Sequence, residues 1–384
     1  MSAEPAGDTG AAHALRRYAL IAGGGTTGHV QPALAIARAL VARGHKQSSI
    51  ELVGSERGIE ARLVPEAGFK LTLLPGRGLQ RKLSWQNLKS LGALVVAFGK
   101  SWRLVGKLRP QVVVSVGGYA SVPCALAAVL RRVPVVVAEQ NATPGAANRL
   151  VARFAKATAV SFPDTPLPRA TVTGNPVRPE VLAIDRARDG AAARAKLGVA
   201  PGRRMVLIFG GSLGALRINR AAVDGARRWA GRSDLHLRHV VGERDWDEIT
   251  GAGPPVTSAA PLHYEALRYD DDMPTSLAAA DVAVCRSGAS TSFELLAAGL
   301  PAVLVPSPFV TADHQTANAR HMAAAGAAVV VADADLTGAR LVDEVDALLA
   351  DPARLAAMSA DARAAARPSA ADDIAALVEA NARG

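Results

Sequence analysis

Residues 23–32, Gly-Gly-Gly-Thr-Thr-Gly-His-Val-Gln-Pro, combine a glycine-rich turn with a histidine. An apolar run, 18–22, precedes them, and a helix-like pattern, 33–42, follows. A strand, a glycine turn and a helix start in this order present unpaired backbone N–H groups to an anion. A phosphate cradle needs no histidine, so His29 predicts proton removal from a hydroxyl, for which an imidazole pKa of about 6.5 is suited. The alternative is that His29 only shapes the loop by bonding its backbone.

Two further glycine turns follow apolar runs, at Gly117-Gly118-Tyr119 and at 210–214. In the second of these, the N–H groups and the Ser212 hydroxyl predict diphosphate binding; the alternative is a structural turn. None of the three turns combines the glycine pattern of dinucleotide-binding folds with an acidic residue about 20 positions further on, and none reads G-x-x-x-x-G-K-[ST]. These absences disfavour an NAD-dependent oxidoreductase and exclude a P-loop.

Residues 285–294, Cys-Arg-Ser-Gly-Ala-Ser-Thr-Ser-Phe-Glu, predict a strand end, a small-residue turn and a helix start. We expect Glu294, in an early turn of that helix, to accept hydrogen bonds from a ribose diol; the alternative is a carboxylate that favours the helix dipole. The polar residues 313–318 predict contacts to sugar hydroxyls, a helix start capped by Asp313, or both. Residues 270–272, three aspartates, predict a loop and helix cap, because a hard-cation site needs more converging oxygens.

The composition is typical of a globular protein with two domains. The chain has 384 residues, of which 49% are hydrophobic, 20% charged and 4% aromatic. Its two cysteines, Cys124 and Cys285, are far apart, which argues against a disulfide framework or a zinc site. The first 13 residues lack an apolar segment, and no charge-free apolar run reaches 18 residues, so we expect neither a signal peptide nor a spanning helix.

The charge is concentrated in one window. The formal net charge is +10, and no Asp or Glu occurs between Glu66 and Glu139. Lysines and arginines there are mixed with Trp85, Phe98, Trp102 and several leucines. This mixture favours a surface that binds an anionic membrane. A solvated basic face is the alternative; nucleic acid is not an expected partner, because we find no recognised binding motif.

Short apolar runs alternate with helix-like segments, which predicts an α/β fold with parallel sheets. The expected strands are 18–22, 49–53, 70–74, 112–116, 133–138, 157–160, 205–209, 237–241, 282–285, 302–305 and 328–331. Two prolines and a glycine within 173–179 predict a domain boundary. We expect domains at 1–178 and 179–384, and leave open whether the last helix, about 360–384, packs back on the first.

The ordered set of motifs resembles the GT-B family of UDP-N-acetylglucosamine transferases that complete lipid II in peptidoglycan synthesis, on which cell shape and division depend. The resemblance covers nearly the whole chain and rests on residues 24–29, 117–119, 139–141, 174–178, 210–212 and 286–294. It implies two Rossmann-like, doubly wound domains facing across a cleft. The first would bind the membrane and the acceptor lipid I, and the second UDP-GlcNAc, with neither metal nor cofactor.

The resemblance also implies the site residues. His29, Tyr119 and Glu294 would be catalytic, with His29 and Tyr119 facing the acceptor. Donor contacts would come from Thr26, Thr27, Gly28, Asn141, Arg178, Ser212, Asp270 through its backbone, Ala289, Ser290, Thr291, Ser292, Phe293, Glu294 and Gln315. Two positions depart from the family. Leu213 stands where a glutamine is usual, and Ala138 stands where a histidine often precedes Glu-Gln-Asn, which removes one alternative base.

The implied reaction is an inverting transfer. His29 would take the proton from the 4-hydroxyl of the N-acetylmuramoyl-pentapeptide unit of undecaprenyl-pyrophosphoryl lipid I as that oxygen attacks the anomeric carbon, which forms a β-1,4 linkage. Loop N–H groups and Arg178 would stabilise the negative charge on the departing UDP. The expected location is peripheral, on the cytoplasmic side of the cell membrane, where other cell-wall synthesis proteins are possible partners. The rival functions are a UDP-GlcNAc 2-epimerase or another GT-B enzyme, and a non-catalytic nucleotide binder.

Overall fold

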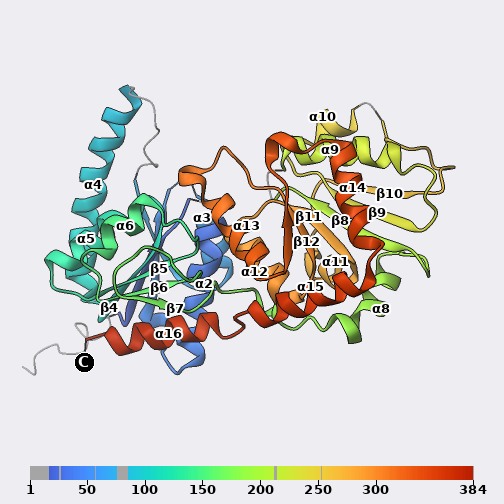
Figure 1. The fold of residues 1–384 in the computed structure, drawn as a ribbon. Coiled ribbons are helices and arrows are strands. Elements are labelled where there is room, and N and C mark those ends of the chain that lie inside the picture. Colours follow the sequence, from blue (N-terminus) through green and yellow to red (C-terminus); the bar gives the residue numbers. More distant parts are fainter. Residues whose placement is uncertain are drawn as a thin grey trace, which may run out of the picture. The chain divides into compact units, whose positions relative to one another are not determined.

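The computed structural model describes residues 17–25, 27–56, 58–75, 85–211, 214–251 and 253–383, with the backbone alone for Thr27 and residues 85–91. The chain forms two compact units (Figure 1). The first runs to Pro176 and also includes the C-terminal segment from Ser369; the second is Val177–Pro368.

The first unit is built on a seven-stranded parallel sheet of order β3-β2-β1-β4-β5-β6-β7. Its strands are β1 Ala19–Gly23, β2 Ile50–Ser55, β3 Lys70–Leu74, β4 Val112–Gly117, β5 Val135–Glu139, β6 Ala157–Val160 and β7 Ala170–Val172. Its helices are α2 Thr27–Ala42, α3 Glu60–Glu66, α4 Trp85–Leu108, α5 Ser121–Leu130, α6 Ala146–Ala152 and α16 Ala370–Asn381, with a 3₁₀ turn η1 at Gln47–Ser49.

Both faces of this sheet are covered, because successive strand residues point to opposite sides. Ile21 belongs to a core with residues of α2 and with Ile374 of α16. Leu20, its neighbour, belongs to a second core with residues of α4 and α5. The final helix α16 therefore packs against α2 and completes the core of the first unit.

The second unit repeats the architecture with a six-stranded parallel sheet of order β10-β9-β8-β11-β12-β13. Its strands are β8 Arg204–Phe209, β9 Leu235–Val240, β10 His263–Leu267, β11 Val282–Cys285, β12 Ala302–Leu304 and β13 Ala328–Val330. Its helices are α7 Pro179–Leu182, α8 Arg186–Lys196, α9 Leu216–Arg228, α10 Trp246–Thr250, α11 Met273–Ala279, α12 Ala289–Ala298, α13 His314–Ala324, α14 Gly338–Leu349 and α15 Pro352–Ala365, with 3₁₀ turns η2 Thr311–Asp313 and η3 Asp333–Asp335.

All eleven expected strands are present, with ends within two residues of the predicted ones. The prediction missed β7 and β10, which lie at sheet edges. The three residues of β7 are exposed, and β10 begins with the exposed His263. Neither has the continuous apolar character of a strand covered on both faces, so the pattern that found the others did not apply.

The strand order reverses once in each sheet, between β1 and β4 and between β8 and β11. At such a switch point the connections leave in opposite directions, and the crevice outside the carboxyl ends of the strands is where α/β folds bind ligands. The three glycine turns follow β1, β4 and β8, and residues 286–288 follow β11. The chemistry-bearing segments therefore lie at the two switch points. Among the described helices, none combines the length and apolar character needed to cross a bilayer.

Candidate active site

In the first unit the turns after β1 and β4 touch each other. A Cβ added at Gly118, whose φ is +82°, would lie 2.3 Å from the carbonyl oxygen of Gly24. Any side chain there would clash with backbone, so the close approach requires glycine. The two loops thus form one continuous rim at the switch point.

His29 lies on this rim. It is the third residue of α2 and is half-buried. A Cβ built at Gly117 would be 3.2 Å from His29 Nε2 and equally far from Asn148 Nδ2, so the imidazole lies against the end of β4. The start of α2 thus brings the predicted base to the loop that carries Tyr119.

Tyr119 is partly buried, and its hydroxyl has no hydrogen-bond partner among the described residues. Burial raises the pKa of this phenol. Tyr119 therefore keeps its proton at neutral pH, and its side chain packs on the core beneath α4 and α5 while its backbone forms part of the same turn.

A buried carboxylate that the sequence did not single out holds the first loop. Glu60, at the start of α3, is 1% exposed. Its oxygens accept from the Gly25 N–H at 3.1 Å, the Ser55 N–H at 2.7 Å and the Ser55 hydroxyl at 2.9 Å. A Cβ at Gly24 or Gly54 would lie within 2.5 Å of this side chain. Glu60 thus fixes the loop that precedes His29, and the glycines around it leave the space.

A second buried carboxylate, Glu139, organises the loop after β5. It accepts from the N–H groups of Asn141 at 3.0 Å and Gly145 at 3.1 Å, and from Asn148 Nδ2 at 2.9 Å. Asn148 Oδ1 also accepts a hydrogen bond from the Ser115 hydroxyl at 3.2 Å. In the sequence, Glu139 stands out only as part of the motif 139–141. Here it positions Asn141, an expected donor contact, at the same edge of the sheet.

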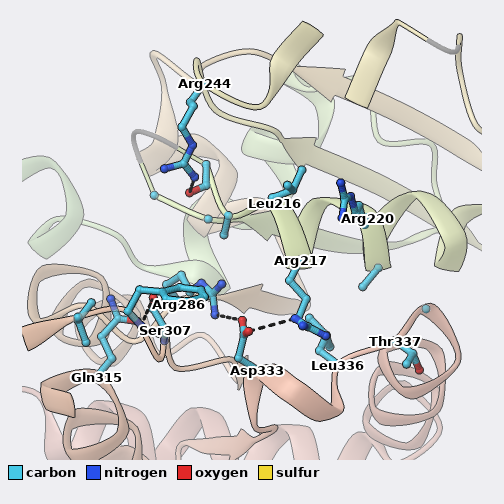
Figure 2. Close-up of a pocket in the computed structure, with 18 residues that line it drawn as sticks. Leu216, Arg217, Arg220, Arg244, Arg286, Ser307, Gln315, Asp333, Leu336 and Thr337 are labelled. Atoms are coloured by element: carbon cyan, nitrogen blue, oxygen red, sulfur yellow. Dashed lines mark hydrogen bonds and ion pairs between the residues drawn. The ribbon is translucent and has the colours of Figure 1, made fainter. Parts of the chain in front are cut away.

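In the second unit the glycine turn after β8 borders a cavity of about 920 Å³, lined mainly by the start of α9 and by segments after β12 and β13 (Figure 2). Within it, Arg286 and Arg217 contact Asp333 at 2.6 and 3.0 Å. Gln315 Oε1 accepts the Ser307 N–H at 2.8 Å, which fixes this expected sugar contact in the wall. The arginines that line the cavity are paired with carboxylates, so the feature suited to an anion is the backbone at the start of α9.

Arg178 and Glu294 are joined in this unit. Arg178 Nε donates to Glu294 Oε1 at 2.7 Å. Burial alone would lower the pKa of Arg178, but the charge of Glu294 and its hydrogen bond outweigh burial and raise it. Glu294 is the sixth residue of α12, hence in its second turn. The alternative of a first-turn dipole partner is therefore wrong, since that effect is confined to the helix end.

The remaining predicted residues fall in three groups. Ala289, Ser290, Thr291, Ser292 and Phe293 form the first turns of α12, and Gly28 lies in the first turn of α2. Asp270 is buried, and its side chain accepts from Ser276 Oγ at 2.6 Å, which leaves only its backbone for a ligand. Thr26 and Ser212 lie outside the described residues, as does Leu213, and of Thr27 only the backbone is described.

The two predicted caps have different outcomes. The Asp272 carboxylate accepts the Thr275 N–H and caps α11, which confirms the loop-and-cap interpretation of the aspartate run. The described residues include no cluster of acidic, histidine or cysteine side chains that could hold a metal ion. Asp313 precedes α13 as expected but does not cap it: at φ +49°, its carboxylate accepts the Thr316 hydroxyl instead of a backbone N–H.

Comparisons with known proteins agree with this arrangement. Residues 19–160 match the glycosyltransferase family 28 N-terminal domain, and residues 205–374 its C-terminal domain. A UDP-N-acetylglucosamine–N-acetylmuramyl-(pentapeptide) pyrophosphoryl-undecaprenol N-acetylglucosamine transferase of Desulforudis audaxviator is 41% identical, over 94% of this chain and 97% of its own.

Solved structures add the fold. MurG of Acinetobacter baumannii is similar with a TM-score of 0.76 and 28% identity, over 95% of this chain and 99% of its own. A putative UDP-N-acetylglucosamine 2-epimerase of Listeria monocytogenes has a TM-score of 0.67 at 14% identity, over 95% and 96% of the two chains. The rival epimerase thus shares the fold, while the close sequence similarity is to transferases.

Proposed function

This chain belongs to glycosyltransferase family 28, and from that membership we infer that it transfers N-acetylglucosamine from UDP-GlcNAc to the N-acetylmuramyl-pentapeptide of lipid I. The product is lipid II, the precursor of peptidoglycan. The observation that carries this function is the 41% identity to a named transferase over 94% of the chain. A likeness restricted to one domain would support only nucleotide-sugar binding, whereas this one includes both sheets.

The second unit holds the donor. The carboxylate of Glu294 accepts hydrogen bonds from the ribose diol. Arg178 and the backbone of the glycine turn after β8 bind the diphosphate. The first turns of α12 and the side chain of Gln315 surround the sugar. The cavity beside this turn supports the assignment, because the start of α9 in its wall places backbone N–H groups where UDP gains negative charge as it leaves.

The first unit supplies the base. His29 takes the proton of the attacking 4-hydroxyl, and the turn that carries Tyr119 faces the acceptor. The oxygen attacks the anomeric carbon from the face opposite UDP, the bond to the diphosphate breaks, and the configuration inverts to β. These roles are supported by the rim that the two turns share at the β1/β4 switch point, where Glu60 fixes the loop before His29. A neutral imidazole suits this step near pH 7.

The first unit also binds the membrane, in this proposal on the cytoplasmic side. Helix α4 exposes Val95 by 68%, Val96 by 54% and Trp102 by 37%. Lys100 and Arg103 are exposed on the same helix. Apolar side chains flanked by cations are typical of surfaces that lie in an anionic headgroup region, where each cation contributes about 1 kcal/mol.

The test uses labelled UDP-GlcNAc with and without a lipid I analogue, and follows UDP and disaccharide together. The transferase releases both in equal amounts, and only when the acceptor is present. Formation of UDP-ManNAc from UDP-GlcNAc alone would instead identify an epimerase. Donor binding without release of UDP in the presence of the acceptor would identify a non-catalytic nucleotide binder.

A further inference from the structure

We propose that a second cavity in the first unit binds a phosphate-bearing anion. Its volume is about 360 Å³, within the usual range of small-molecule sites. It lies where β1, β4 and β5 begin, since its lining includes residues just before these strands, whereas the glycine turns follow their ends. The lining residues are Arg17, Val105, Gly106, Arg109, Pro110, Gln111, Arg131, Val133 and Arg383.

Four arginines and no acidic residue line this cavity. Arg17 is neutralised by Glu51, which it contacts at 3.0 Å. For Arg109, Arg131 and Arg383, no carboxylate lies within ion-pair distance in the part of the chain that the structure describes. Three like charges around one cavity repel each other, and an anion between them removes that repulsion.

Arg131 is held in an orientation suited to an anion. Its guanidinium lies over the ring of Trp102, 4.0 Å from the centroid. Gly106, four residues after Trp102 on α4, leaves room for the guanidinium, because a Cβ there would come within 2.6 Å of Arg131 Nη2. Arg131 Nε is buried and has no hydrogen-bond partner among the described residues. Stacking fixes the plane of the guanidinium and leaves its edge, with its fork of donors, for a phosphate.

The backbone holds the other two unpaired arginines at the cavity. Arg109 directly follows the last residue of α4 and has a φ of +44°, and its N–H donates to the Val105 carbonyl at 3.0 Å. The Arg383 N–H donates to the Gln111 carbonyl at 3.0 Å, and its guanidinium donates to the carbonyls of Arg131 and Arg132. Residues from α4, from the turn after α5 and from the end of α16 thus converge on one cavity.

Phosphate fits this site because guanidinium forks match its oxygens in geometry and charge. The group could belong to a lipid headgroup or to a soluble phosphate compound. Either source leaves the catalytic assignments untouched, because no residue of this cavity was placed in the donor or acceptor site.

The test is a titration with inorganic pyrophosphate, followed by calorimetry and by Trp102 fluorescence. UDP is added in saturating amount so that the donor site is occupied. We expect one saturable site in the wild type, and affinity lowered at least tenfold in Arg131→Gln and in Arg109→Gln. The control Arg153→Gln removes an equal charge from an exposed position of the same unit and binds as the wild type does.

Vesicles distinguish the source. Competition by phosphatidylglycerol vesicles but not by phosphatidylcholine vesicles identifies a lipid headgroup; no competition identifies a soluble phosphate. Wild-type affinity in both Arg131→Gln and Arg109→Gln, with melting temperatures unchanged, would overturn the proposal. Transfer of GlcNAc by both variants stays within about twofold of wild type, so a failure of this site and a failure of the proposed function are read separately.

Discussion

Arg178 Nε donates to Glu294 Oε1 at 2.7 Å, which joins two side chains assigned to different parts of the donor. The pair orients both: Glu294 keeps its second oxygen for the ribose, and Arg178 keeps its terminal nitrogens for the diphosphate. Neither side chain can be removed without loosening the other. This relationship distinguishes a preorganised donor site from two independent contacts.

The pair predicts non-additive effects on donor binding. Glu294→Ala raises the KM for UDP-GlcNAc by roughly 10- to 100-fold, since a hydrogen bond to a charged group is worth about 1.5–3 kcal/mol. Arg178→Ala has an effect of similar size, and the double variant loses less than the sum of the two. The measurement is initial rates at saturating acceptor. Strictly additive losses would show that the two contacts act independently.

Glu60 predicts a separate loss of stability and activity. In Glu60→Gln the amide N–H₂ faces the Gly25 and Ser55 N–H groups, so one buried donor pair is left unsatisfied. We expect roughly 1–3 kcal/mol lower stability in urea unfolding. We also expect a lower kcat, because the loop before His29 loses its anchor.

Glu66→Gln is the matched control, since it lies on the same helix and makes only an exposed pair with Arg62. It changes stability by less than about 0.5 kcal/mol. Equal effects of the two substitutions would show that Glu60 has no special role in holding the loop.

A buried histidine predicts acid sensitivity of the second unit. His239 contacts Tyr264 Oη at 2.8 Å and Asn219 Oδ1 at 3.0 Å, and burial lowers its pKa to about 4. Between pH 6.5 and 4 the unfolded chain binds a proton here that the folded protein does not. The free energy of unfolding is therefore at its highest with respect to this group above about pH 6.5. It falls by roughly 3 kcal/mol as the pH drops to 4.

Urea unfolding of the wild type at several pH values checks this. His239→Gln, which cannot titrate, flattens the pH dependence, although burial also lowers the pKa of His263 and leaves a smaller slope of the same sign. A wild-type stability that stays constant from pH 6.5 to 4 would contradict the assignment.

The sequence predicted the fold well because most strands are covered on both faces. Ile21 and Leu20 illustrate this: each is fully buried, in a different core, so the strand reads as a continuous apolar run. The glycine turns were predicted equally well, because two backbone segments can approach this closely only where one of them carries no side chain. The strands β7 and β10 were missed because β7 is exposed and β10 begins at an exposed residue, so neither reads as a continuous apolar run.

The site was predicted less completely, because roles that depend on tertiary contacts leave little local signal. Glu60 and Glu139 are buried acids whose partners include loop N–H groups, and little in the sequence around them distinguishes them from exposed acids. The link between Arg178 and Glu294 joins residues 116 positions apart. The only sequence signal for Glu60 is the nearby glycines, Gly54 and Gly58, which make room for its side chain.

Membrane binding predicts a dependence on the exposed face of α4. Val95→Asp weakens binding to phosphatidylglycerol vesicles roughly tenfold, because it replaces an exposed apolar side chain, which would enter the lipid, with a charge that the lipid repels. Binding by the wild type weakens with added salt. The control Leu182→Asp, an exposed apolar residue of the second unit, binds normally in a sedimentation assay. Wild-type binding by Val95→Asp would remove α4 from the membrane contact.

In the proposed reaction His29 is the base for the acceptor hydroxyl, and single-turnover transfer with preloaded UDP-GlcNAc measures this step alone. His29→Gln keeps the donor affinity of the wild type and slows transfer by about 10²- to 10⁴-fold. The rate also loses the rise with pH that deprotonation of an imidazole produces. A variant that transfers GlcNAc at close to the wild-type rate, with the same pH profile, would show that His29 is not the base.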